Sequence, residues 1–123
     1  MDLIEIQKII YDKLKELKYP VVDDFVLYQE TTPPYIQLSS LYISENNTKV
    51  EEGLYVEQYI NIYSDYRGKK EILDIAQEVC EVMNFRTDSI YVKEDRKSII
   101  LDIDKNNNRF YHAVLIFKIY IQE

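Results

Sequence analysis

The stretch from Leu54 to Met83 most constrains the fold, because two different hydrophobic periods follow each other within it. From Leu54 to Ser64 the side chains alternate: Val56, Ile60 and Ile62 share one face with Gln58, and the other face carries Tyr55, Glu57, Tyr59, Asn61 and Tyr63. A period of two predicts a half-buried strand. After the polar turn Asp65–Gly68, apolar residues recur at spacings of three and four up to Met83, which predicts an amphipathic helix. Gly68 stands where the turn needs a permissive backbone.

The segments before this unit predict one helix and two further strands. Asp2 is suited to cap a helix running to about Lys18, and Pro20 ends it. Phe25–Gln29 is interpreted as a short strand and Tyr35–Ser44 as a longer one, with a change of phase near Leu41. Glu45–Gly53 is then a polar hairpin tip that projects as an arm if its strands outrun the core.

The segments after the unit predict a terminal hairpin. Asn84–Lys97 is polar and irregular in pattern, with room for a short strand at Ile90–Lys93. Ser98–Asp104 and Arg109–Ile121 form the hairpin, and the apolar run in its second strand predicts a central position covered on both faces. We therefore expect one domain over residues 1–123, of class α+β, with a mainly antiparallel sheet, two helices packed on it and the order α-β-β-β-α-β-β.

Composition restricts the classes of function. The formal net charge is −7, from 22 acidic against 15 basic residues, so nonspecific attraction to nucleic acid is not expected. A single cysteine excludes an internal disulfide framework and a multi-thiolate metal site. The first residues lack the pattern of a signal peptide, which favours the cytoplasm. The 12 tyrosines are consistent either with strand propensity or with a subunit contact surface.

Candidate chemical sites are weak. Asp102–Asn108 has oxygen-bearing side chains at alternate positions, but it lacks the glycine and the glutamate that a calcium loop needs, so an asparagine-rich turn is the better interpretation. Asp102 and Asp104 also permit a metal-dependent nuclease pair, although no third carboxylate is placed by the sequence. His112 has no nucleophile in a suitable context, and Cys80 lies on the apolar stripe of a helix. We predict no catalytic residue, metal site or cofactor.

Three segments carry a resemblance to a known family. These are Tyr55–Val79, Pro34–Leu38 and the closing strand Arg109–Ile121. Together they resemble the phage tail terminator, or tail completion, proteins, small head–tail joining proteins of tailed phages and prophages. The asparagine-rich segment Lys105–Asn108 and the acidic overall charge have no counterpart in that pattern.

The resemblance implies a structural protein without catalysis. Members of the family form a ring, usually hexameric, that caps the head-proximal end of the tail tube, stops its polymerisation and offers a surface to the head connector. Implied partners are further copies of the chain, the tail tube protein and the head connector protein, while DNA passes through the channel without specific binding. The implied location is the host cytoplasm during assembly and then the virion tail. A head–tail connector adaptor and a small metal-dependent phage nuclease are the alternatives.

Five residues are the interface candidates within this interpretation. Tyr55, Tyr59 and Tyr63 share one strand face, and Asp65 and Arg67 lie in the turn that follows.

Overall fold

The computed structural model describes residues 2–25, 31–45 and 53–122. Its elements are α1 (Leu3–Leu14), β1 (Val21–Asp23), β2 (Tyr35–Glu45), β3 (Gly53–Ser64), α2 (Lys70–Met83), β4 (Ile90–Ile103) and β5 (Arg109–Gln122). The class α+β and the element order α-β-β-β-α-β-β predicted from the sequence are confirmed.

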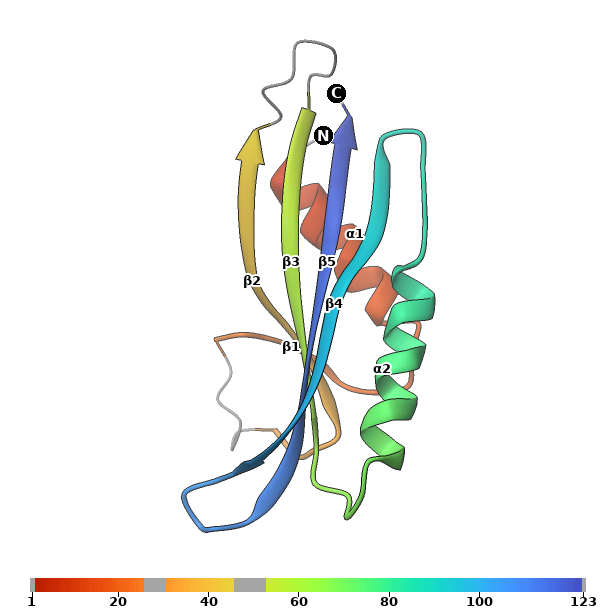
Figure 1. The fold of residues 1–123 in the computed structure, drawn as a ribbon. Helices are drawn as coiled ribbons and strands as arrows, with labels where there is room; N and C mark the ends of the chain where they lie inside the picture. Colours follow the sequence, from red (N-terminus) through yellow and green to blue (C-terminus); the bar gives the residue numbers. More distant parts are fainter. Residues whose placement is uncertain (1, 26–30, 46–52, 123) are drawn as a thin grey trace.

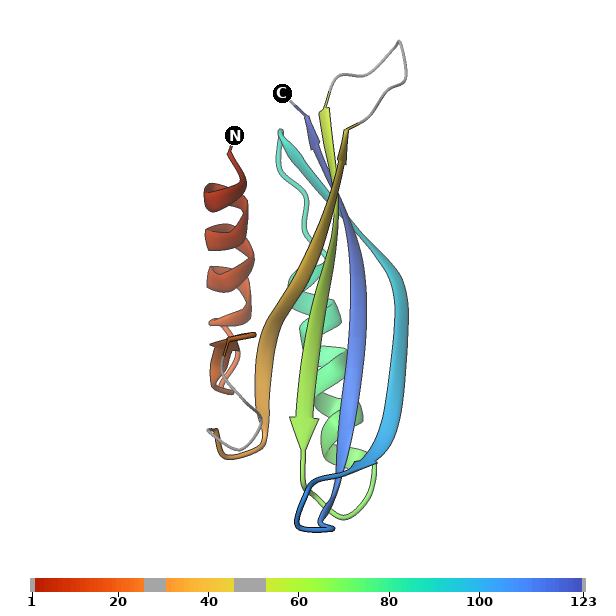
Figure 2. The same ribbon diagram turned by 90° about the vertical axis from the view of Figure 1, so that its left-hand side faces the viewer.

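The five strands form one sheet in the order β1-β2-β3-β5-β4. β1 pairs parallel with β2, and the other neighbours pair antiparallel. Both helices lie on the same side of this twisted sheet (Figures 1 and 2). We call the other side, which no helix of the described residues covers, the open face.

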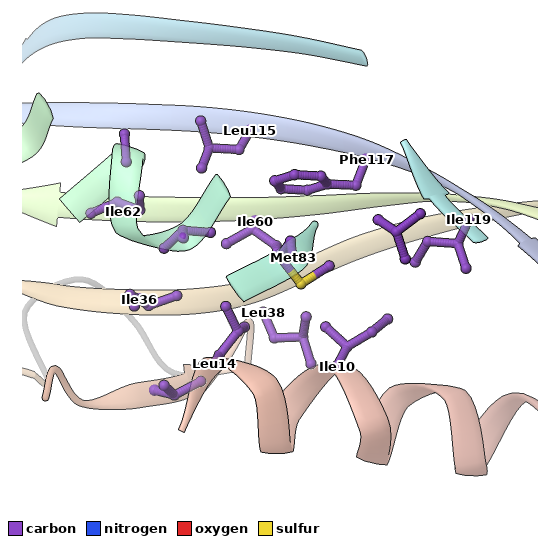
Figure 3. Packing of buried hydrophobic residues seen from close by; sticks show 14 of the residues in the cluster. Ile10, Leu14, Ile36, Leu38, Ile60, Ile62, Met83, Leu115, Phe117 and Ile119 are labelled. Atoms are coloured by element: carbon purple, nitrogen blue, oxygen red, sulfur yellow. The ribbon is translucent and has the colours of Figure 1, made fainter. Parts of the chain in front are cut away.

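The core lies between the helices and the sheet. Ile10 and Leu14 of α1 point towards the side chains of β2 and β3, and Met83 of α2 closes the same layer (Figure 3). On β3 the predicted alternation holds, because Val56, Gln58, Ile60 and Ile62 are buried and the intervening residues are half-buried. The apolar stripe of α2 is likewise buried, with Cys80 half-buried beside it.

Local signals fix the ends of several elements. The Asp2 carboxylate accepts a hydrogen bond from the Glu5 N–H at 2.8 Å, so the predicted cap of α1 is confirmed, although the helix ends at Leu14 rather than near Lys18. Gly68 has a φ of 127°, a conformation that L side chains rarely adopt. Asn107 has a φ of 63° in the turn between β4 and β5, as the interpretation of that segment as an asparagine-rich turn requires.

Three expectations need correction or fall outside the described residues. Asn84–Lys97 is not mainly irregular, because a single strand β4 runs from Ile90 to Ile103. The predicted strand Phe25–Gln29 lies outside the described residues except for Phe25, which is in a turn after β1. The hairpin tip lies outside them over 46–52.

β5 is central, between β3 and β4, but the helices cover only one of its faces. Its inward residues from Ala113 to Ile121 are fully buried. On the open face Phe110 and Ile116 are also buried, whereas Tyr120 is 42% exposed. The expected covering of both faces of this strand therefore holds at Phe110 and Ile116 and fails at Tyr120.

Candidate interaction surface

The open face carries a band of aromatic side chains that crosses three strands at the end where β3 leads into α2. Tyr63 of β3 stacks on Tyr35 of β2, with ring centroids 4.9 Å apart, and on His112 of β5, at 4.5 Å. Phe110 lies 6.1 Å from Tyr63. The register explains the band, since Tyr35 pairs with Tyr63 and Tyr63 pairs with His112. Directly opposed side chains on one face of a sheet come within contact distance.

A second aromatic group lies at the opposite end of the open face. Tyr120 of β5 lies 5.1 Å from Tyr55 of β3 and 6.1 Å from Tyr91 of β4. Between the two groups, Tyr59 packs edge-on against Tyr42 of β2 at 5.4 Å. Because β3 rises about 3.4 Å per residue, its Tyr55, Tyr59 and Tyr63 extend along roughly 27 Å of the open face. The three tyrosines named from the sequence therefore share one surface, as expected.

Charged residues stand beside the second group. The Lys118 ammonium lies 3.8 Å from the Asp95 carboxylate and 5.8 Å from the centre of the Tyr55 ring. Burial raises the pKa of Tyr55, and the hydrogen bond that the Lys118 ammonium donates to the Tyr55 hydroxyl raises the pKa of the lysine, so both stay protonated at neutral pH. The Tyr55 hydroxyl also donates to Glu57 at 3.4 Å. This end of the face is an aromatic surface with a charged margin.

Asp65 and Arg67 lie at the other end, in the turn between β3 and α2. Both are exposed, and they line a surface hollow of about 750 Å³ together with the β4–β5 turn. They thus share an end of the molecule with Tyr63 and not with Tyr55. The five candidates form a strip down the open face and around its end, rather than one compact cluster.

The residues considered for chemistry have structural roles. The Asp104 carboxylate accepts hydrogen bonds from the N–H groups of Asn106 and Asn108, at 2.8 and 2.9 Å, and so holds the turn. Asp102 accepts from the N–H of Ile103. Within the described part of the chain, no group of three or more His, Cys, Asp or Glu residues is placed to hold a metal ion. Burial, and next the charge of Glu94, raises the pKa of Cys80 to about 11, which keeps it a thiol.

Sequence reasoning did not name the aromatic partners on the neighbouring strands. The exposed partners are Tyr42, Tyr91 and Tyr120, whereas Tyr35 and Phe110 are buried beneath the band around Tyr63 and His112. The alternation of β5 could have indicated its share, because every second residue from Phe110 to Tyr120 faces the same way. The cross-strand register, which joins these residues to those of β3, is not visible in the sequence.

No helix of the described residues is long and apolar enough to cross a membrane. No protein-family model matches the chain, and no curated protein matches it.

The fold itself is one that occurs in a virion. One of the 31 matching chains of solved structures belongs to the virion of a native gene transfer agent particle. The two share 13% sequence identity with a TM-score of 0.70, over 93% of this chain and 92% of that one. At this identity the likeness shows a shared fold over nearly the whole length of both chains.

Proposed function

We propose that this protein is a structural component of a virion, namely a tail terminator that caps the head-proximal end of a tail tube as a ring of six copies. The observation that carries the proposal is the end-to-end similarity in fold to a virion chain. The resemblance of Tyr55–Val79 and the flanking segments to tail terminators assigns the particular role. The ring stops polymerisation of the tube and presents a surface to the head connector, first in the host cytoplasm and then in the virion tail.

The open face supports a role in protein contact. Aromatic side chains that are partly exposed supply large apolar area while their hydroxyl groups tolerate water, and tyrosine is enriched at protein interfaces. Tyr42, Tyr91 and Tyr120 are 59%, 43% and 42% exposed, and they stand on three different strands. This surface suits burial against another virion protein better than it suits catalysis.

The overall charge fits a channel that DNA crosses without specific binding. The chain carries a net charge of −7, so a ring of copies is acidic overall and attracts phosphate groups weakly. The cations of Arg96 and Lys118 each lie within 4 Å of the Asp95 carboxylate, which offsets their charge.

The test is assembly on tail tubes. The purified protein is added to the polymerising tail tube protein, and tube length and tube ends are recorded by negative-stain microscopy. We expect shorter tubes that carry a ring at one end only. Tubes of unchanged length without caps would contradict the tail terminator role.

The similarity to a virion chain supports a head–tail connector adaptor as well. The same preparation is therefore mixed with the isolated head connector. Binding to the connector together with failure to cap tubes would assign the adaptor role.

A further inference from the structure

The outer edge of β4 has two halves of opposite character. In the first half, Lys93–Lys97 is a run of five charged residues, and a bulge interrupts the register between Glu94 and Arg96. Lys97 pairs with Glu94 at 2.6 Å, and Asp95 contacts Lys118. Charges and bulges are the features by which proteins prevent an edge strand from pairing with another chain.

The second half, Ser98–Ile103, has none of these features except the single charge of Asp102. Ile100, Leu101 and Ile103 are 45%, 53% and 57% exposed. Because successive residues of a strand point to opposite faces, this segment exposes apolar side chains on both sides of the sheet. β4 pairs only with β5, so within the described residues no strand takes the outward hydrogen-bonding groups of this half. A regular apolar edge of this kind is suited to strand addition.

A matching segment lies at the opposite side of the sheet. β1 pairs with β2 only over Ile36–Leu38, so within the described residues Leu41–Ser44 pairs with β3 alone. Tyr42 and Ile43 there are 59% and 45% exposed, again on opposite faces.

We propose that Ser98–Leu101 of one copy pairs antiparallel with the β2 segment Leu41–Ser44 of a second copy of this chain. The proposal identifies the subunit contact of the ring and thus rests on the proposed function. Strand direction supports it: β2, β3, β5 and β4 alternate in direction, so β4 runs opposite to β2. A neighbour in the same orientation therefore presents its β2 antiparallel to β4, as a head-to-tail ring requires.

The side chains of the two segments match in this register. Ile43 stands opposite Ile99, Tyr42 opposite Ile100 and Leu41 opposite Leu101. The faces agree as well, because Ile43 and Ile99 both belong to the helix-covered side, and Tyr42 and Ile100 both belong to the open face. Apolar and aromatic cross-strand pairs are among those that stabilise sheets.

The pairing also brings a stagger between neighbours. Within one subunit, Ile99 is level with Ile36, through its pairing with Ala113 and the pairing of Ala113 with Ile62. Ile43 pairs with Val56, which lies six residues from Ile62 along β3 (62 − 56 = 6), so each neighbour is displaced along the strands by six residues. A sheet that closes on itself accommodates such a stagger when its strands are tilted relative to the ring axis.

Exposed apolar side chains of the two helices favour the same contact. Leu73 of α2 is exposed and lines a hollow beside β4. α1 packs beneath β2 and exposes Tyr11. Pairing β4 with a neighbouring β2 brings α2 alongside the neighbour's α1, where these side chains add apolar and aromatic area to the contact.

Disulfide trapping tests the contact. In a Cys80→Ser background, Tyr42→Cys and Ile100→Cys are combined in one chain, oxidised, and resolved on a non-reducing gel. We expect a ladder of covalent oligomers ending at the ring, because every subunit supplies one cysteine to each neighbour. Each single variant should give no ladder. The pair Tyr42→Cys with Lys93→Cys, which uses the charged half of β4, is the register control and should remain uncrosslinked.

Light-scattering mass on the same samples separates this inference from the proposed function. Rings without the Tyr42–Ile100 ladder would overturn the strand pairing and leave the tail terminator role intact. Dimers from the Ile100→Cys variant alone would show β4 pairing with β4 and would also overturn it. A protein that is monomeric at every concentration and forms no crosslinks on tail tubes would also overturn the strand pairing. The tail terminator role would then still be decided by whether the protein caps tubes.

A substitution at the exposed edge gives a second measurement. Leu101→Lys places a charge where the neighbouring strand would pack, and we expect the dissociation constant of the oligomer to rise at least about tenfold. The matched control is Phe25→Lys, at a residue in the turn after β1 that is 92% exposed, and it should leave the dissociation constant of the oligomer unchanged. An equal effect of the two variants would contradict the proposal.

Discussion

Gln58 shows how one polar residue on an apolar strand face can hold an irregular strand in place. Its side chain is fully buried among aliphatic residues, and its amide donates to the carbonyl groups of Ser39, Ser40 and Tyr59 at 3.1, 3.4 and 2.9 Å. Gln7 of α1 donates to its carbonyl oxygen at 2.7 Å. Ser39 and Ser40 form the bulge of β2, so this amide joins the bulge to the first helix.

We therefore predict that Gln58→Leu lowers the free energy of unfolding by about 1–3 kcal/mol, because the bulge carbonyls and the Gln7 amide lose their buried partner. Urea unfolding followed by circular dichroism measures the change. Gln77→Leu, at an exposed residue of α2, is the control and should stay within about 0.5 kcal/mol of the unsubstituted protein. Equal stability of the two variants would contradict this role of Gln58.

His112 should make stability depend on pH. Its half-buried imidazole stacks on Tyr63, and burial holds its pKa below the ordinary value of 6.5, against a smaller opposite effect of Asp102. The unfolded chain therefore binds a proton near pH 6.5 that the folded chain does not, and the free energy of unfolding falls as the pH is lowered through that value.

The prediction is a loss of stability between pH 7.5 and pH 5.5 that disappears in His112→Gln. Because His112 is the only histidine, the difference between the two proteins isolates its titration. Urea midpoints at the two pH values provide the measurement. The same pH dependence in both proteins would show that another group is responsible.

At the scale of elements, the sequence predicted those whose pattern is local. The β3–turn–α2 unit follows directly from the change of period at Gly68, and the extent of β5 from its apolar run. The sequence predicts two separate strands, Ile90–Lys93 and Ser98–Asp104, where the structure has the single strand β4. The charged run between them shows no alternation, but backbone pairing with β5 continues through it across a bulge. β1 has only three residues, too few to show a period, and exists through its parallel pairing with β2.

The start of β3 depends on a close approach that only glycine permits. A Cβ added at Gly53 would lie 2.4 Å from the carbonyl oxygen of Ile121 in β5. We predict that Gly53→Ala costs about 1–3 kcal/mol, because the obstacle is backbone and one of the two strands must move. Chemical denaturation measures this cost, with the exposed Ser44→Ala of β2 as control. If Gly53→Ala left the free energy of unfolding unchanged, this end of the β3–β5 pair would be able to separate without cost.

At the scale of the whole molecule, the sequence predicted only the β3 part of the aromatic surface. The alternation of β3 places Tyr55, Tyr59 and Tyr63 together. Their partners on β2, β4 and β5 depend on strand order and register, which arise from contacts between residues far apart in the chain. The turn residues Asp65 and Arg67 come beside the β4–β5 turn because Ser64, which precedes them, pairs with Tyr111 at the start of β5.

Arg67 tests whether this end of the molecule contacts the tube or a neighbouring subunit. Its side chain is exposed, so Arg67→Glu should leave the fold intact while it changes the charge of the hollow between the two turns by two units. We predict assembly weakened by at least about tenfold where the guanidinium meets a carboxylate of the partner, because the introduced glutamate places two like charges against each other. The measurements are ring mass by light scattering and the fraction of capped tubes in negative stain. Loss of capping with intact rings would assign the turn to the tube-facing surface. Loss of the rings themselves would assign it to the subunit contact. Unchanged assembly would show that Arg67 belongs to neither surface.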